Sequence, residues 1–233
     1  MVYALLDQVR QRSNIDPALV EDICLGNVSD GKAAYKLRAA ALAAGFPNTA
    51  GASSVNRFCS SGLKAAADIA HAIAEGSIEV GIAMGAETMS VGGDRLEKPF
   101  DEAVTAKSQE AADCMQLMGW TSENVSKDFN VTRDEMDKFA AESFQRAEKT
   151  QKAGWSDDEI VPITTKVQGK DGEWTEVTLT KDDGIRPGTT YEGLSKVRAA
   201  FPQWGGCTTG GNASQVTDGG EFERRNKCAR VKC

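Results

Sequence analysis

The stretch NRFCSSGL at residues 56–63 decides how the first part of the chain folds. Residues 52–58, which overlap its start, suit a buried strand, and the stretch leads into a helical pattern at residues 63–75. Further helical patterns and short apolar runs alternate on either side of it, at residues 2–12, 23–28, 33–44 and 80–84. Strands that alternate with helices at this pitch predict an α/β fold built on a parallel sheet.

Cys59 lies in this stretch, where the predicted strand meets the first turn of the predicted helix. Unpaired backbone N–H groups and the helix dipole favour the thiolate there, and the thiolate is the reactive form of cysteine. The small residues that follow, Ser60, Ser61 and Gly62, leave room for a substrate carbonyl, and their amides could bind an oxyanion. Two alternatives stay open: a buried, inert cysteine, which is the commoner case, and a redox-responsive thiol.

His71 is the single histidine of the chain, and it follows Cys59 by twelve positions. If one helix carries both residues, roughly 18 Å separates them along the helix axis. A general base must lie within about 3 Å of the proton that it removes. We therefore expect His71 to be a polar residue on the flank of its helix, and a base for Cys59 must come from elsewhere.

Composition and charge exclude several classes of protein. The chain has 233 residues, 27 Lys and Arg against 34 Asp and Glu, and a net charge of −7. The acidic balance argues against a nucleic-acid-binding protein, because binding to phosphates needs a basic surface. No apolar run has the roughly 20 residues that span a bilayer, so no membrane span is expected. Six scattered cysteines and one histidine make a metal site improbable. No secretory leader is evident, which favours reduced thiols.

The middle of the chain has a different pattern, helical and charged. The sequence TRDE at residues 132–135 is a capping box that predicts a helix with an apolar face made of Met136, Phe139, Ala140 and Phe144. A hairpin is expected from residues 160–167 and 174–179, joined at 170–172. Residues 221–233 carry a net charge of +3 and few apolar side chains, which predicts a disordered tail. The expected divisions are a partial core, an inserted domain, a return segment and that tail, at residues 1–92, 93–205, 206–220 and 221–233.

Two further residues remain ambiguous from the pattern alone. Arg186 lies in a predicted loop, where it could contact a phosphate or remain a solvated surface charge. Met118 could line an acyl groove or belong to an ordinary core. The paired glycines match neither of the two common nucleotide-binding motifs, GxGxxG and GxxxxGK[ST].

Six segments, taken in order, resemble the thiolase family over about residues 2–219, most of all its peroxisomal 3-ketoacyl-CoA branch. They are NRFCSSGL at 56–63, MGAETMS at 84–90, MGWTSENV at 118–125, DEIVP at 158–162, DDGIRP at 182–187 and GNASQV at 211–216. The resemblance implies a layered αβαβα thiolase fold with two similar halves and a loop domain inserted in the first. It also implies that this chain is an incomplete N-terminal half, without the C-terminal half.

The resemblance implies a role for four residues. Cys59 would be the nucleophile that attacks the keto carbon of a 3-ketoacyl-CoA, and free CoA would then resolve the acyl-enzyme. Met118 would line the pantetheine, Arg186 would contact a CoA phosphate, and the Ser214 hydroxyl would lie near the pantetheine. CoA and acyl-CoA would be substrates rather than resident cofactors. The implied partner is a second copy of the chain or a full-length thiolase.

The chain also departs from the family pattern. The Gly-His-Pro segment and the Cys-x-Gly-x-Gly loop, which carry the family's base histidine and acid/base cysteine, are not in this sequence. We therefore expect a truncated, weakly active or inactive acetyl-CoA C-acyltransferase of fatty acid β-oxidation. The alternatives are a non-catalytic fragment that binds CoA or dimerises, and a biosynthetic acetoacetyl-CoA-forming thiolase. The implied compartment is the peroxisome, with the cytoplasm and mitochondrion as alternatives.

Overall fold

The computed structural model describes residues 1–90, 101–169 and 171–226, the last four by their backbone only. The expected boundary at 92/93, Lys170 of the hairpin and Cys228 and Cys233 lie outside these ranges. The chain divides into two compact units. Unit 1 comprises Met1–Asp94, Val161–Leu179 and Thr217–Cys233, and unit 2 comprises Arg95–Ile160 and Thr180–Val216. Each unit is described by itself below.

Unit 1 is built on a four-stranded sheet with the strand order β2-β1-β3-β6. The strands β2, β1 and β3 run parallel, as the sequence predicts, and β6 runs antiparallel to β3. The elements of this unit are α1 (Val2–Ser13), the short 3₁₀ helix η1 (Pro17–Leu19), β1 (Asp22–Gly26), α2 (Ala33–Ala43), β2 (Gly51–Val55), α3 (Ser61–Glu75), β3 (Val80–Glu87), β4 (Ile163–Gln168), β5 (Trp174–Leu179) and β6 (Gly219–Asn226).

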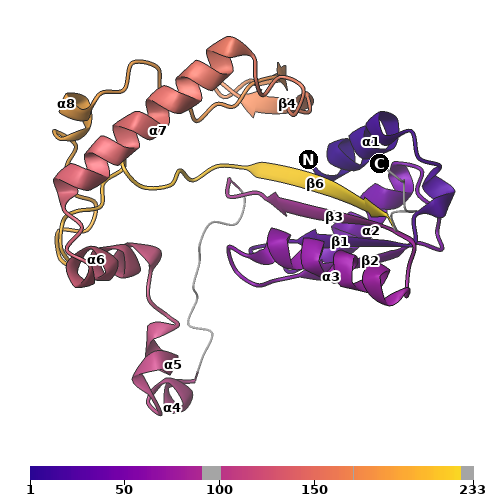
Figure 1. Ribbon diagram of the computed structural model, residues 1–233, viewed down its shortest axis with the longest axis horizontal. Coiled ribbons are helices and arrows are strands. Elements are labelled where there is room, and N and C mark those ends of the chain that lie inside the picture. Colours follow the sequence, from indigo (N-terminus) through magenta and orange to yellow (C-terminus); the bar gives the residue numbers. More distant parts are fainter. Residues whose placement is uncertain (91–100, 170, 227–233) are drawn as a thin grey trace, which may run out of the picture. The chain divides into compact units, whose positions relative to one another are not determined.

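Helices cover both faces of this sheet, α1 and α2 on one side and α3 on the other (Figure 1). The pleat explains the two cores, because successive side chains of a strand point to opposite faces. In β1, Ile23 and Leu25 pack with α1 and α2, whereas Cys24 packs against α3. In β3, Ile82 and Met84 join the first core and Ala83 joins the second. The expected α/β class is confirmed.

The strand β6 corrects one expectation from the sequence. Its residues Gly219–Asn226 pair with Val80–Glu87 of β3, so the prediction of a disordered tail is wrong for residues 221–226. The prediction was based on low apolar content. An edge strand, however, forms its hydrogen bonds through the backbone and needs only a few buried side chains. Phe222 supplies one of these and packs partly buried against the core of α1 and α2.

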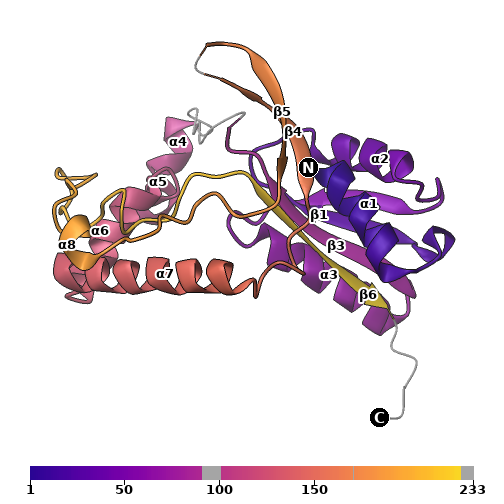
Figure 2. The ribbon, with the colours of Figure 1, turned by 90° about the horizontal axis from the view of Figure 1, so that it is seen from above.

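The predicted hairpin is present, as the antiparallel pair β4 and β5 (Figure 2). Ile163 pairs with Leu179 at its base, and the hydroxyl groups of Thr164 and Thr178 lie 3.0 Å apart across the strands. Such cross-strand threonine pairs stabilise a two-stranded sheet. Val161, just before β4, packs against the core of unit 1.

Unit 2 consists of helices joined by long loops. Its elements are α4 (Glu102–Thr105), α5 (Gln109–Asp113), α6 (Met118–Asp128), α7 (Arg133–Ala153) and α8 (Tyr191–Leu194). The predicted capping box begins the 21-residue helix α7, because the Thr132 side chain accepts from the Glu135 N–H and the Glu135 side chain accepts from the Thr132 N–H. Within the described ranges, none of the helices combines the length and apolar character that crossing a membrane requires.

The buried face of α7 differs from the expected one. Phe139 is 72% exposed, whereas Ala140 and Ala141 pack against Leu194 of α8. Asp137 takes a buried place on the same helix at 1% exposure. Small residues allow α8 to approach closely, and a paired carboxylate replaces the apolar side chain that periodicity alone predicts.

Candidate active site

Cys59 lies just beyond β2, at the carboxyl edge of the parallel sheet of unit 1. Ligands of open α/β sheets bind at this edge, because the loops that leave the parallel strands meet there. The Cys59 side chain is exposed, so the sequence-based alternative of a buried, inert thiol is wrong for this residue. By contrast, Cys24 of β1 is buried, and this burial raises the pKa of its thiol despite a hydrogen bond from Ser53 that lowers it.

A tight turn presents Cys59. Phe58 has a left-handed backbone with φ of 50°, which is unfavourable for a residue with a Cβ. Asn56 stabilises that turn by accepting a hydrogen bond from the Phe58 N–H through its side-chain oxygen at 2.9 Å. The buried Ser61 hydroxyl accepts from the Arg57 N–H at 2.8 Å and donates to the Phe58 carbonyl at 2.5 Å. The turn is therefore held on both sides of the cysteine.

The first turn of α3 lies unusually close to the sheet. Gly26, the last residue of β1, faces the backbone of Ser61 and Gly62, and a Cβ there would overlap with both. Gly62 and Gly85 of β3 also meet across this contact. Glycine allows such an approach because it has no side chain. The start of α3, two residues after Cys59, is thereby held close to β1 and β3.

A second set of hydrogen bonds joins the strand ends. Glu87, the last residue of β3, accepts from the Val28 N–H at 2.8 Å, in the loop after β1. The Val28 carbonyl accepts in turn from the Asn56 side-chain amide at 3.1 Å. The loops that leave β1, β2 and β3 are thus tied together beside the cysteine, and Asn56 belongs to both sets of contacts.

Two of the three expected oxyanion donors, the Ser60 and Ser61 amides, already donate within the turn. The Ser60 N–H donates to the Arg57 carbonyl at 3.1 Å, and the Ser61 N–H donates to the Phe58 carbonyl at 3.0 Å. An oxyanion site beside Cys59 would therefore use the Gly62 N–H or donors from elsewhere. His71 is exposed in the second half of α3, ten positions after its first residue, as expected for a polar residue on a helix flank.

The other three candidate residues, Met118, Arg186 and Ser214, lie in unit 2. Met118 is the first residue of α6, and its side chain is 66% exposed. It lines an apolar groove of about 300 Å³ between α6 and the start of α7, together with Thr121, Ser122, Val125, Ser126, Val131 and Met136. Met118 is therefore a groove residue rather than a core residue.

Arg186 is an exposed residue in the loop between β5 and α8. Its Nη1 donates to the Asp183 carbonyl of the same loop at 2.7 Å. The loop is attached to α7, because the Gly188 N–H donates to the Glu148 carboxylate at 2.9 Å. The pKa of Glu148 is held below its ordinary value, mainly by its ion pair with Lys152 and to a smaller extent by the hydrogen bond from the Gly188 N–H. The exposed cation is suited to an anionic ligand.

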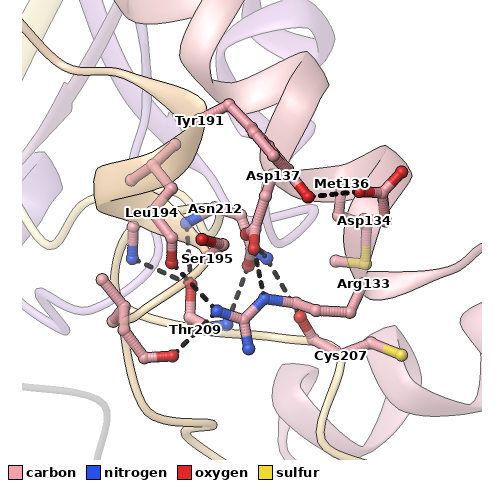
Figure 3. A network of polar contacts seen from close by, with 12 residues as sticks. Arg133, Asp134, Met136, Asp137, Tyr191, Leu194, Ser195, Cys207, Thr209 and Asn212 are labelled. Atoms are coloured by element: carbon pink, nitrogen blue, oxygen red, sulfur yellow. Dashed lines mark hydrogen bonds and ion pairs between the residues drawn. The ribbon is translucent and has the colours of Figure 1, made fainter.

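Ser214 is exposed and follows a turn that two buried carboxylates hold in place. Asn212 donates to Asp137 of α7 at 2.9 Å and to the Cys207 carbonyl at 2.9 Å (Figure 3). Asp137 in turn pairs with Arg133 at 2.6 Å. On the other side, the Glu123 carboxylate of α6 accepts from the N–H groups of Cys207 and Thr208 at 3.0 and 2.7 Å.

One hydrogen bond joins the segments of Ser214 and Arg186. The Gln215 side chain donates to the Gly184 carbonyl at 2.7 Å, two residues before Arg186. Hydrogen bonds of Glu123, Asn212 and Gln215 thus connect the three segments of unit 2 that carry the candidate residues. Sequence reasoning missed Glu123, Asp137 and Asn212. Arg133 and Asp137 have the spacing of an ordinary surface ion pair, and nothing in the pattern shows that the carboxylate is buried.

The comparisons with known proteins all point to the same family. The family model described as "Thiolase, N-terminal domain" matches residues 1–221. The peroxisomal 3-ketoacyl-CoA thiolase A of Candida tropicalis is 45% identical over 216 residues, which cover 92% of this chain and 52% of that protein. The Homo sapiens peroxisomal 3-ketoacyl-CoA thiolase is 42% identical over 235 residues, covering 99% and 55%. The chain spans about half the length of the curated relatives that it matches.

Solved structures agree with this match. The dimeric peroxisomal thiolase of Saccharomyces cerevisiae superposes with a TM-score of 0.80 at 37% identity, over 97% of this chain and 57% of that one. Human mitochondrial 3-ketoacyl-CoA thiolase in complex with CoA superposes with a TM-score of 0.75 at 28% identity, over 94% and 56%. With its cysteine turn at the carboxyl edge of a parallel sheet, the chain belongs to the thiolase family and matches the N-terminal domain of that family.

Proposed function

We propose that the chain carries the nucleophile of a 3-ketoacyl-CoA thiolase and that Cys59 is this nucleophile. The observation that supports it most is the exposed thiol of Cys59 on the constrained turn after β2. A nucleophile must be accessible to its substrate and held in one place, and this turn meets both conditions. Similarity to peroxisomal 3-ketoacyl-CoA thiolases supports the choice of substrate and, with it, a peroxisomal location.

The proposed reaction has two steps. In the first, the Cys59 thiolate attacks the keto carbon of the 3-ketoacyl-CoA, and a carbon–carbon bond breaks. Its electron pair stays on the departing carbon, which takes up a proton and leaves as acetyl-CoA. In the second step, a CoA thiol loses its proton and attacks the Cys59 thioester. The shortened acyl-CoA leaves and the Cys59 thiolate returns, so atoms and charges balance.

Both steps need a group that gives and takes protons. His71 is not suited to this role, because it is exposed on α3 far along the helix from Cys59. We propose that this group comes from a polypeptide segment outside residues 1–233. The chain alone would then be weakly active or inactive, because removing one member of a catalytic set costs several orders of magnitude in rate.

We further propose that unit 2 corresponds to the inserted loop domain and binds CoA. Met118 would line the pantetheine, Ser214 would place a hydroxyl near it, and the guanidinium of the exposed Arg186 would contact a phosphate. The structural support is the chain of contacts that connects their three segments. A dimer with a second copy or with a full-length thiolase is part of this proposal, supported by the dimeric yeast relative.

A thiolysis assay with acetoacetyl-CoA and CoA tests the proposal. We expect acetylated Cys59 to appear by mass spectrometry on the purified chain, with turnover far below that of a complete thiolase. Cys59→Ser should remove the label, while Cys114→Ser, which changes another exposed cysteine, should keep it. Turnover equal to a complete thiolase would contradict the need for a second segment. Binding of CoA without any acetylation would instead favour the non-catalytic alternative.

A further inference from the structure

Glu123 is a buried acidic residue that the proposed reaction does not use. Its side chain lies on α6 and the residue is 2% exposed. A buried carboxylate is costly unless hydrogen bonds compensate for the lost water. Here burial opposes ionisation, but the N–H groups of Thr208 and Cys207 outweigh it and hold the pKa of Glu123 below its ordinary value. The carboxylate is therefore present as an anion that binds two consecutive backbone amides.

The surroundings of Glu123 are shaped to fit it. A Cβ on Gly205 would overlap with the Glu123 carboxylate, so glycine at this position leaves room for the carboxylate where it binds the two amides. The neighbouring Ser122 hydroxyl lies 2.8 Å from the Thr208 hydroxyl and adds a third hydrogen bond between the same two elements. These contacts join α6, which begins with Met118, to the segment that continues to Ser214.

We propose that Glu123 is a positioning residue for coenzyme A binding, because its carboxylate fixes the segment that carries Ser214 against the helix that carries Met118. This inference rests on the proposed function. Glu123 itself need not touch the ligand. Its role is to keep the distance between the Ser214 hydroxyl and the groove lined by Met118 fixed, so that one CoA molecule can contact both residues.

Loss of Glu123 should leave unit 2 folded, because other contacts hold the same segment. Asn212 attaches the far end of the turn to Asp137 of α7. The N–H of Thr209 also donates to the Asn212 side chain at 2.8 Å, which closes the turn on itself. Removing the Glu123 carboxylate therefore frees the Cys207 and Thr208 amides without removing the anchor at Asn212.

A double-mutant cycle on CoA affinity tests the proposal, with calorimetry on the full chain. We expect Glu123→Gln to raise the Kd for CoA about tenfold, since each hydrogen bond from an amide to a charged group is worth a factor of this order. Ser214→Ala should weaken binding in the wild-type chain and have little further effect in the Glu123→Gln chain. Met118→Ala, on the same helix as Glu123, should remain additive with Glu123→Gln. Additive effects of Glu123 and Ser214 would overturn the proposal.

Hydrogen exchange separates this proposal from the proposed function. In Glu123→Gln we expect faster exchange of the Cys207 and Thr208 amides and unchanged exchange in α3, whether or not CoA binds. Glu142→Gln changes an exposed glutamate on α7 and should alter neither exchange nor Kd. If the wild-type chain binds no CoA, the proposed function fails, and unchanged exchange at Cys207 and Thr208 would overturn the role of Glu123 by itself. If Glu123→Gln does not fold, Ser122→Ala replaces it and should show the same increase in exchange of the Cys207 and Thr208 amides, at smaller size. Unchanged exchange in Ser122→Ala would then overturn the proposal.

Discussion

The side-chain oxygen of Asn56 accepts a hydrogen bond from the N–H of Phe58 at 2.9 Å, and it does so while Phe58 holds a left-handed backbone with φ of 50°. The two residues flank Arg57, and Phe58 directly precedes Cys59. Asparagine often stabilises turns through its side chain in this way. The relationship stores backbone strain at the residue before the candidate nucleophile, and strained residues of this kind cluster at functional sites.

Substitutions of Phe58 test this strain. Phe58 is 75% exposed, so removal of its ring costs little packing. We expect Phe58→Gly to leave the free energy of unfolding within about 1 kcal/mol of wild type, because relief of strain offsets the greater freedom of the unfolded chain. Phe58→Val should destabilise by about 1–2 kcal/mol, because a β-branched residue tolerates positive φ poorly. Urea denaturation measures both. Equal stability of the two variants would contradict the strain.

The cysteines should differ in reactivity toward iodoacetamide. Cys59 and Cys114 are exposed, whereas Cys24 is buried with a raised pKa, so Cys24 should react only on unfolding. We also expect Cys59 to react faster than Cys114. The Cys114 thiol donates a hydrogen bond to the Glu110 carbonyl at 3.3 Å, an interaction that only the protonated thiol makes. Peptide mass spectrometry over a time course gives the order, and early labelling of Cys24 would contradict it.

The cap of α7 should be a measurable source of stability. Thr132 accepts from the Glu135 N–H, an N-cap contact whose loss typically costs about 1 kcal/mol. We expect Thr132→Ala to lower the free energy of unfolding by this amount. Thr132→Ser keeps the hydroxyl oxygen and should be close to neutral. Thermal melts of the two variants and the wild type measure this difference. Equal losses of stability in both variants would show that the hydroxyl is not the source of the stabilisation.

Phe222 of strand β6 should contribute to the stability of unit 1. Its side chain is partly buried against the core of unit 1, so Phe222→Ala should destabilise by about 1–3 kcal/mol. Tyr35→Ala removes an aromatic ring that is 82% exposed on α2 and should change stability little. The alternate amides of β6 that point toward β3 should also exchange slowly. Exchange at the rate of an unstructured peptide would restore the expectation of a disordered tail.

Glu123 gives a prediction with a definite sign in pH. Its pKa in the folded chain lies below the ordinary value of about 4.5, so its stabilisation is full above that value and is lost as pH falls through the folded pKa. Glu123→Gln should therefore be less stable than wild type at pH 6, by about 1–3 kcal/mol. The difference should shrink on acidification below pH 4.5. Denaturation at pH 6 and pH 3 measures it, and a difference that does not change with pH would contradict the assignment.

Much of the fold follows from local pattern in the sequence. The strand pattern before Cys59 and the helical pattern after it predict β2 and α3, because periodicity is set by neighbouring residues. The expectation of a buried strand is wrong, since β2 is mostly exposed. The capping box at Thr132 predicts the start of α7 for the same reason, since its partners lie three residues apart. Cys59 could be singled out because a strand–helix junction is itself a local feature.

Other features arise only when distant segments meet. Glu123 and Thr208 are 85 positions apart, and no local pattern shows that a glutamate in a helix will be buried against the N–H groups of a loop. Phe139 was expected inside and is exposed, because the small residues Ala140 and Ala141 allow α8 to pack beside them. Strand β6 forms because the open edge of β3 offers it backbone hydrogen bonds. The sequence by itself determined most elements of unit 1 and singled out Cys59 as the candidate nucleophile. The tertiary structure decided which charges are buried and which edge is filled, since burial and pairing depend on residues far apart in the chain.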